Sequence, residues 1–367
     1  MNTMIQILKK KNYRFFRGEP FIDRDNEISF LHSYFEGNPR RVLFLYGPKS
    51  TGKTTLMEYV LKNLDKNYWV NYLNLRRTLI ASYENFVYSF FEEEDKTEEL
   101  NRTYDLKIFK LEAKTLKAVK SQSKNLFAEL IRQFEKIKEQ KIFVIDEIQV
   151  LEDIYVEENK ELLKEFLNFC VALTKELHLV HVVILTSNTI FLERIYNDAR
   201  MKETSDFKLI NHPDKSVAIQ TLKDLGYSDE KIELIIEYYG SVINRIIRLY
   251  TYVKPDDSIE KLREFLEEEM IEAKSYIIDI LVHKDKYNLE KEREEVFIEI
   301  ITEMVEKGLY DYAHKRLNTK RKVIKIIEVF SEKEIFFFEP KTSIVTPNSR
   351  IYLKAMQSYL KDYNGTY

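Results

Sequence analysis

The feature that most constrains this chain is a glycine loop near its N-terminus. The loop matches the pattern G-x-x-x-x-G-K-[ST] and reads Gly47-Pro48-Lys49-Ser50-Thr51-Gly52-Lys53-Thr54, with Thr55 directly after it. Because the 367 residues include only 8 glycines, such a match rarely arises by accident in a chain of this composition. The loop predicts a binding site for the phosphates of a nucleotide.

The segments on both sides of the loop favour this interpretation. Residues 41–46 form an apolar run of strand length, and residues 54–61 carry apolar side chains at helical spacing. A strand, a loop and a helix in this order direct backbone N–H groups at phosphate oxygens. Lys53 would then place its charge at the β- and γ-phosphates, and Thr54 would offer its hydroxyl to Mg²⁺. We therefore expect ATP and Mg²⁺ as cofactors; the alternative is a tight turn with a solvent-facing lysine.

An acid pair follows a second apolar run. Residues 142–145 are continuously apolar, as in a strand buried on both faces, and they end in Asp146-Glu147. Ligands of open parallel sheets bind at the carboxyl ends of the strands. We predict that Asp146 orients Mg²⁺ through water and that Glu147 activates the attacking water as a general base. The alternative is a surface acid pair in a loop, but both acids after a phosphate loop favour hydrolysis.

Polar residues also end a third buried strand. Residues 181–185 are apolar after the initial histidine, and Thr186-Ser187-Asn188 follows. Ser187 or Asn188 would lie beside the acid-pair strand, where a polar side chain can hydrogen-bond to the γ-phosphate or the attacking water. The alternative is an ordinary strand end capped by turn-forming polar residues.

Composition excludes several other classes of protein. A length of 367 residues predicts two or three domains. The net charge of −3 argues against a strongly basic nucleic-acid binder, and the single cysteine, Cys170, excludes an internal disulfide and a multi-cysteine zinc site. No apolar run approaches the roughly 18 residues of a membrane span, and no apolar signal core begins the chain. We expect a cytoplasmic protein that does not bind membranes.

Four blocks together resemble a known family. The segment F-I-D-R-D-N-E at 21–27, the glycine loop, V-I-D-E-I-Q at 144–149 and I-L-T-S-N at 184–188 resemble, in this order, the archaeal ATPase family. That family belongs to the AAA+/STAND branch of the P-loop NTPases and is related to the archaeal origin-recognition ATPases. The resemblance implies an α/β fold, with a parallel sheet flanked by helices, then a helical lid and a C-terminal winged-helix-like domain.

The resemblance also implies roles for single residues. Phe21, Asp23 and Arg24 would lie by the adenine and the ribose. Arg200 falls where the family often carries an arginine that acts on a neighbouring subunit's nucleotide in a homo-oligomer; a solvated surface arginine is the alternative. Asn74 falls where related enzymes keep a polar residue that restrains the catalytic glutamate.

The lid departs from the family pattern. In place of a G-G-x-P motif the chain reads Gly240-Ser241-Val242-Ile243, without the second glycine or the proline. Arg245 or Arg248 could still reach the nucleotide, and the alternative is that both are structural. The departure concerns the geometry of the lid and not nucleotide binding.

We predict three domains. They are a P-loop ATPase domain at 1–206 with a helical, insertion-like region at 81–140, a helical lid at 207–262, and a helical and winged-helix-like domain at 263–367. In the insertion-like region, lysines recur at helical spacing and are interpreted as a solvated helix face: Lys107, Lys110, Lys114, Lys117 and Lys120. In the last domain, residues 335–347 predict a hairpin, with Pro347 suited to an edge.

These features leave three functions open. The first is an Mg²⁺-dependent ATPase that couples hydrolysis to conformational change. The second is a slow, nucleotide-dependent switch that signals to a protein partner through its lid and C-terminal domain. The third is a DNA-binding ATPase whose basic cluster at 315–322 contacts double-stranded DNA.

Overall fold

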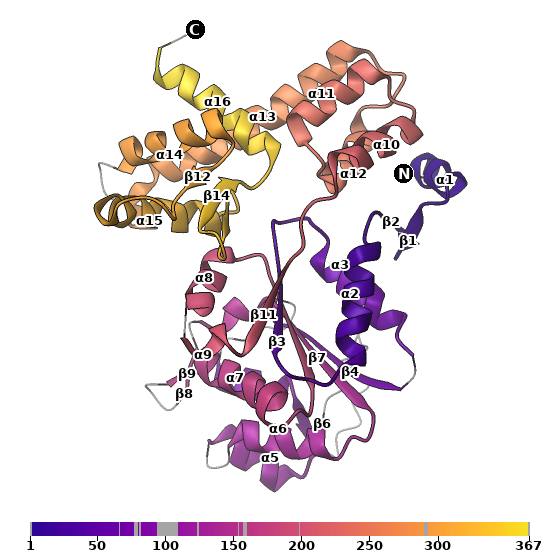
Figure 1. Ribbon diagram of the computed structural model, residues 1–367, viewed down its shortest axis with the longest axis vertical. Helices are drawn as coiled ribbons and strands as arrows, with labels where there is room; N and C mark the ends of the chain where they lie inside the picture. The colour runs from indigo at the N-terminus through magenta and orange to yellow at the C-terminus, as the bar shows by residue number, and fades with distance from the viewer. Residues whose placement is uncertain are drawn as a thin grey trace.

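The computed structural model describes residues 2–65, 67–76, 80, 82–93, 109–122, 125–152, 154–156, 160–197, 199–289 and 293–365 (Figure 1). Its centre is a parallel sheet of five strands: β3 (Val42–Tyr46), β4 (Tyr68–Asn74), β7 (Gln140–Asp146), β10 (His181–Thr186) and β11 (Ser205–Leu209). The strands lie in the order β11-β3-β10-β7-β4, and each neighbouring pair is parallel. Strand β10 therefore separates the strand before the glycine loop from the strand before the acid pair.

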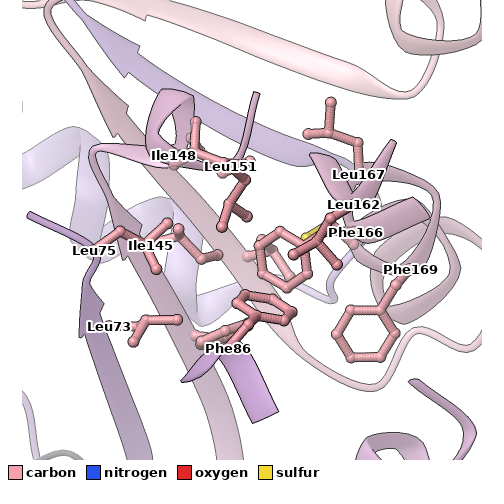
Figure 2. Close-up of a cluster of buried hydrophobic side chains, with 14 of the residues drawn as sticks. Leu73, Leu75, Phe86, Ile145, Ile148, Leu151, Leu162, Phe166, Leu167 and Phe169 are labelled. Atoms are coloured by element: carbon pink, nitrogen blue, oxygen red, sulfur yellow. The ribbon is translucent and has the colours of Figure 1, made fainter. Parts of the chain in front are cut away.

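Helices cover both faces of this sheet (Figure 1). One face carries α2 (Asp25–Glu36) and α3 (Lys53–Lys62), and the other carries α4 (Tyr83–Tyr88), α5 (Ala113–Lys120), α6 (Leu126–Glu135) and α7 (Leu162–Val171). Alternate residues of β7 enter the two cores: Ile142 and Val144 pack on the first face, and Phe143 and Ile145 on the second. Figure 2 shows the second core, where Ile145 lies among leucine and phenylalanine side chains.

The region predicted to be insertion-like, 81–140, is the crossover between β4 and β7. Its helices bury Phe86, Val119 and Phe134 in the core beside the sheet, so the domain depends on them for one of its layers. The crossover also holds a two-stranded parallel sheet of β5 (Phe91–Glu93) and β6 (Phe109–Leu111). Of the lysine stripe, Lys107 lies outside the described residues, and Lys120 pairs with Glu84 at 2.6 Å.

A helical lid follows the sheet. It consists of α10 (Lys215–Leu225), α11 (Asp229–Tyr239) and α12 (Ile243–Tyr252), and the N-terminal helix α1 (Asn2–Lys10) packs into the same apolar cluster through Met4 and Leu8. The long helix α13 (Ile259–Val282) begins in this cluster and ends in the next one. Both predicted domain boundaries fall inside secondary-structure elements: position 206 lies within β11, and position 262 lies within α13.

The C-terminal part joins three helices to a small antiparallel sheet. The helices are α14 (Arg293–Lys307), α15 (Leu317–Glu332) and α16 (Arg350–Tyr363), and the strands are β12 (Tyr310–Asp311), β13 (Phe336–Glu339) and β14 (Ile344–Pro347). The predicted hairpin is confirmed as β13 and β14. Although β14 is the central strand, β12 pairs only with Ile344 and Val345, so Pro347 needs no donor on that side. The winged-helix assignment remains a prediction.

Short elements complete the described chain. They are β1 (Arg14–Phe16), β2 (Glu19–Phe21), β8 (Tyr155–Val156), β9 (Lys160–Glu161), α8 (Thr189–Asn197), α9 (Ala199–Lys202), the 3₁₀ turns Ile148–Leu151 and Lys284–Tyr287, and the π-helical turn Ala172–Glu176. Within the described ranges, no helix has the length and apolarity that crossing a bilayer requires.

Candidate nucleotide site

The glycine loop joins β3 to α3 at the carboxyl edge of the sheet, as predicted. The backbone N–H of Ile210 donates to the Tyr46 carbonyl at 2.7 Å, which brings the chain after β11 against the loop. A Cβ at Gly47 would lie 2.0 Å from the Ile210 carbonyl oxygen, so only glycine fits there. Gly52, with φ of +80°, turns the chain into α3. Steric constraints therefore explain why both motif positions are glycine.

Lys53 points back into the loop. Its ammonium donates to the carbonyl oxygens of Gly47 at 2.9 Å and Pro48 at 2.8 Å. Burial lowers the pKa of Lys53 to about 8. An anion that enters the loop would compete with these two carbonyl oxygens for the ammonium, and it would favour the charged form of the lysine.

Arg24 ties the loop to its surroundings. Its buried guanidinium donates to the Thr51 carbonyl at 2.7 Å and to the Asn211 carbonyl at 2.9 Å, and it pairs with Glu27 at 3.1 Å. Arg24 therefore fixes the position of the loop relative to α2 and to the chain after β11. The resemblance had placed this residue by the adenine and ribose; in addition, it has this architectural role.

A cavity of about 340 Å³ lies beside the loop, between β2 and α12. One part of its lining is apolar and includes Phe21 and Ile247, and another part is the loop itself, with Ser50 and Thr55. The ring of Phe21 stacks on Tyr59 with 4.5 Å between centroids. An apolar slot next to a phosphate loop suits a purine base. Of the three residues expected there, Phe21 and Arg24 line the cavity, and Asp23 lies outside its lining, in the turn before α2.

Thr54 and Asp146 meet as predicted. The Thr54 hydroxyl donates to Asp146 Oδ2 at 3.0 Å, and the same oxygen accepts from the Tyr72 hydroxyl at 2.7 Å and Asn74 Nδ2 at 3.2 Å. Sequence reasoning missed Tyr72, although its place in β4, two residues before Asn74, puts both side chains on one side of the sheet. A hydroxyl beside a carboxylate is the oxygen chemistry that Mg²⁺ prefers, so the residues present fit this ion. Within the described part of the chain, no cluster of three or more His, Cys, Asp or Glu side chains offers a different metal site.

Glu147 adopts a left-handed backbone conformation, with φ of +65°, at the end of β7. Its carboxylate accepts from Arg76 Nη2 at 3.0 Å and from Gln149 Nε2 at 2.5 Å. Burial raises the pKa of Glu147, and the nearby Arg76 charge opposes that rise. Asn74, which was expected to restrain this glutamate, donates to Asp146. The groups that hold Glu147 are Arg76 and Gln149, and sequence reasoning did not assign either of them that role.

The polar end of β10 is arranged differently from the expectation. Asn188 Oδ1 accepts from the Phe191 backbone N–H at 3.0 Å, so this side chain caps α8. The Asn188 backbone N–H donates to the Thr186 hydroxyl at 3.0 Å. That hydroxyl donates to Gln149 Oε1 at 3.3 Å. The link from β10 to the acid pair therefore runs through Thr186, and the capping alternative describes the Asn188 oxygen.

The remaining site residues lie as follows. Ser187 is half-buried at the end of β10, and Arg200 lies in α9, with its side chain outside the described part of the structure. Arg245 and Arg248 of the lid both pair with the buried carboxylate of Glu269, at 3.1 and 3.0 Å. Both lid arginines thus tie α12 to α13, which is the structural alternative for them.

The C-terminal sheet touches the nucleotide-binding half of the molecule. Lys49 of the loop forms an ion pair with Glu334, and the Tyr46 hydroxyl donates to Glu339 Oε1 at 2.6 Å. Phe337 packs in the core on one face of the large sheet. The C-terminal part is therefore in direct contact with the phosphate-binding loop.

The basic cluster at 315–322 is partly used within the protein. Lys315 pairs with Glu303 at 2.5 Å, and Lys320 donates to the Ala313 carbonyl at 2.8 Å. Arg316 and Arg321 are exposed. Two of the lysines proposed to bind duplex DNA, Lys315 and Lys320, thus already make contacts within the protein.

Comparison with known proteins agrees with this geometry. Residues 21–249 match the model of an ATPase domain found predominantly in Archaea. An uncharacterized ATP-binding protein of Methanocaldococcus jannaschii is 32% identical over 90% of this chain and 96% of its own length. A second one, from Pyrococcus abyssi, is 30% identical over 93% of this chain and 98% of its own.

Among solved structures, a Walker-type ATPase of Pyrococcus abyssi superimposes with a TM-score of 0.57 at 14% identity, over 92% of this chain and 96% of its own. This likeness concerns the fold. The family model covers more than half of the chain and includes the glycine loop, the acid pair and the lid helices α10 and α11. The chain belongs to the family of ATPases found predominantly in Archaea.

Proposed function

We propose that this protein is an Mg²⁺-dependent ATPase that couples hydrolysis to conformational change. The observation that carries the proposal is the meeting of the glycine loop, Asp146 and Glu147 at one edge of the sheet, with Thr54 3.0 Å from Asp146. The base would lie in the apolar slot beside Phe21, and the phosphates would lie in the loop, near Lys53. With the base and the phosphates of ATP placed in this way, the γ-phosphate would lie beside the acid pair.

In this mechanism the protein's own groups orient the reactants and move one proton. Thr54 and Asp146 would hold Mg²⁺, which supplies positive charge to the phosphate oxygens when bound. Lys53 stabilises the charge on the β- and γ-phosphates. The Glu147 carboxylate accepts a proton from water as the water oxygen attacks the γ-phosphorus and the bond to ADP breaks. Arg76 and Gln149 both donate to Glu147 Oε2, so Oε1 would be the oxygen that accepts this proton.

We expect Lys53→Ala to weaken ATP binding about tenfold or more, because a charge-assisted contact with the phosphates is lost. The matched control is Lys62→Ala, which removes an exposed lysine from the same helix and should leave affinity unchanged. Calorimetric titration with ATP measures both. Equal ATP affinity in Lys53→Ala and the wild type would remove the loop lysine from the phosphate site.

The raised pKa of Glu147 predicts a pH dependence. The carboxyl acts as a base only when it is ionised, so turnover should fall as the pH drops through a value above the ordinary glutamate pKa of about 4.3. Removing the Arg76 charge raises the pKa of Glu147 further, so Arg76→Ala should move this acid limb to higher pH. Arg76→Lys keeps the charge and is the control. Profiles of turnover against pH that coincide for all three proteins would contradict this account.

The contact between Lys49 and Glu334 favours a second function, the nucleotide-dependent switch. Glu334 places a negative charge beside the loop that would receive the phosphates, so ATP binding and docking of the C-terminal sheet would oppose each other. The position of the C-terminal part would then depend on whether ATP is bound, and a protein partner could recognise this difference. A switch of this kind predicts slow basal turnover, and fast turnover by the purified protein would argue against it.

We expect Glu334→Gln to tighten ATP binding by about two- to fivefold, since an exposed ion pair contributes roughly 0.2–1 kcal/mol. Glu332→Gln is the control, because it changes an exposed acid two residues earlier, at the end of α15. Titration of each variant with ATP gives the comparison, and small-angle scattering with and without ATP reports whether the C-terminal part moves. Unchanged affinity and unchanged scattering together would exclude this coupling.

The DNA-binding alternative is tested by adding duplex DNA to the turnover assay. This alternative predicts that DNA stimulates ATP turnover.

A further inference from the structure

His212 lies in the connection between β11 and the lid, and its backbone is held against the glycine loop. The preceding residues are fixed by two bonds: Ile210 N–H to the Tyr46 carbonyl at 2.7 Å, and Arg24 to the Asn211 carbonyl at 2.9 Å. The next residue is a proline, which restricts the backbone of His212 to extended conformations. The imidazole therefore projects from a short, tethered segment at the base of the lid.

Three cavities meet at this side chain. His212 lines the 340 Å³ cavity beside Phe21, a second of about 270 Å³ that includes Lys49 and Glu334, and a third of about 740 Å³ that reaches the C-terminal sheet. Ser50 of the loop lines the first two. His212 thus stands where the slot for the base passes into the space around the phosphate loop.

The imidazole has unused hydrogen-bonding capacity. Both ring nitrogens are buried, and neither has a hydrogen-bond partner among the described residues. Burial lowers the pKa of His212 to about 4, and the positive charges of Arg24, Lys53 and Arg245 lower it as well. At neutral pH the ring is therefore uncharged, with one N–H donor and one acceptor. Buried polar groups nearly always find a partner, which points to a ligand that supplies one.

We propose that His212 is a nucleotide-binding residue, whose ring N–H donates to an oxygen of the bound nucleotide where the base slot meets the phosphate loop. That oxygen belongs to the ribose or to the phosphate chain. The proposal rests on nucleotide binding at the loop and is independent of hydrolysis. Because His212 lies in the connection between β11 and α10, this bond would link the nucleotide directly to the segment that joins the sheet to the lid.

The chain provides a control in His181. This histidine is also buried, and burial lowers its pKa to about 4. Its Nε2 lies 3.0 Å from the Gly37 carbonyl at the beginning of β10, the end of the strand opposite the nucleotide site, and it lines none of the three cavities. Replacing His181 tests the effect of losing a buried imidazole without touching the site.

The test is calorimetric titration of wild type, His212→Phe, His212→Gln and His181→Phe with ADP, AMP and adenosine. We expect His212→Phe to weaken ADP binding about tenfold, His212→Gln to restore part of the loss through its amide N–H, and His181→Phe to bind as the wild type does. A loss that persists with adenosine assigns the oxygen to the ribose, and a loss that requires AMP or ADP assigns it to the phosphate chain. Wild-type affinity of His212→Phe for ADP would overturn the proposal.

A second measurement does not depend on folding of the phenylalanine variant. The chain has 6 histidines, so ring NMR signals can be assigned by comparison with His212→Gln. Addition of ADP to the wild-type protein should shift the His212 signal and leave the His181 signal in place. If ADP binds and the His212 signal does not move, the proposal is wrong although nucleotide binding stands; if ADP does not bind to the wild type, the ATPase proposal itself fails.

Discussion

Glu147→Gln is expected to lower ATP turnover by at least about a hundredfold and to leave ATP affinity close to that of the wild type. Glutamine keeps the size of the side chain and can still bond to Arg76 or Gln149, but its amide cannot accept the proton of the attacking water. The affinity should survive because the phosphate contacts of the loop do not involve this residue.

Steady-state phosphate release and ATP titration of the same preparation measure the two quantities. Glu139→Gln is the control, since it changes an exposed acid just before β7 while the carboxyl edge of the strand stays intact. Wild-type turnover in Glu147→Gln would exclude this residue as the base. Loss of ATP binding would instead assign it a structural role.

Gly47→Ala is expected to disrupt the loop itself. The added Cβ would lie 2.0 Å from the Ile210 carbonyl oxygen, which is backbone and cannot rotate away. Either the loop or the chain after β11 must move, so we expect a loss of roughly 1–3 kcal/mol in the free energy of unfolding, as for an overpacked core. ATP affinity should fall as well, because the carbonyl of this residue and the bond between Tyr46 and Ile210 help to position Lys53.

Gly37→Ala is the matched control for this substitution. Gly37 has φ of −79°, and the nearest atom to an added Cβ is 3.7 Å away, an ordinary contact. Thermal unfolding and ATP titration of the two variants separate the steric effect at Gly47 from the general effect of adding a methyl group. Equal stability and affinity of the two variants would show that the loop tolerates the clash by a small adjustment.

The sequence was sufficient for the parts of the site that depend on local pattern. The glycine loop, its flanking strand and helix, and the meeting of Thr54 with Asp146 were all predicted, because a parallel sheet brings the carboxyl ends of its strands to one edge. The C-terminal hairpin was also predicted from local pattern, because two short apolar runs flank a turn.

The rest depends on which strands and helices become neighbours. Tyr72 reaches Asp146 because β4 lies next to β7, and no motif in the sequence predicts that these two strands pair. The same holds for the contact of Glu334 with Lys49, which joins residues 285 positions apart. Asn188 was assigned to the nucleotide because polar strand ends in such sheets often bind ligands, but its oxygen caps the helix that follows. The burial of Phe86, Val119 and Phe134 against the sheet could not be predicted either, because it is a tertiary contact.

The most direct test of the account is a single-turnover assay with excess purified protein and ATP labelled at the γ-phosphate. We predict labelled phosphate and ADP as products when Mg²⁺ is present, and neither product when the ion is chelated or when Lys53 is replaced by alanine. A slow rate would fit the switch, and a fast rate the ATPase. Recovery of intact ATP, bound to the protein in the presence of Mg²⁺, would contradict hydrolysis at this site.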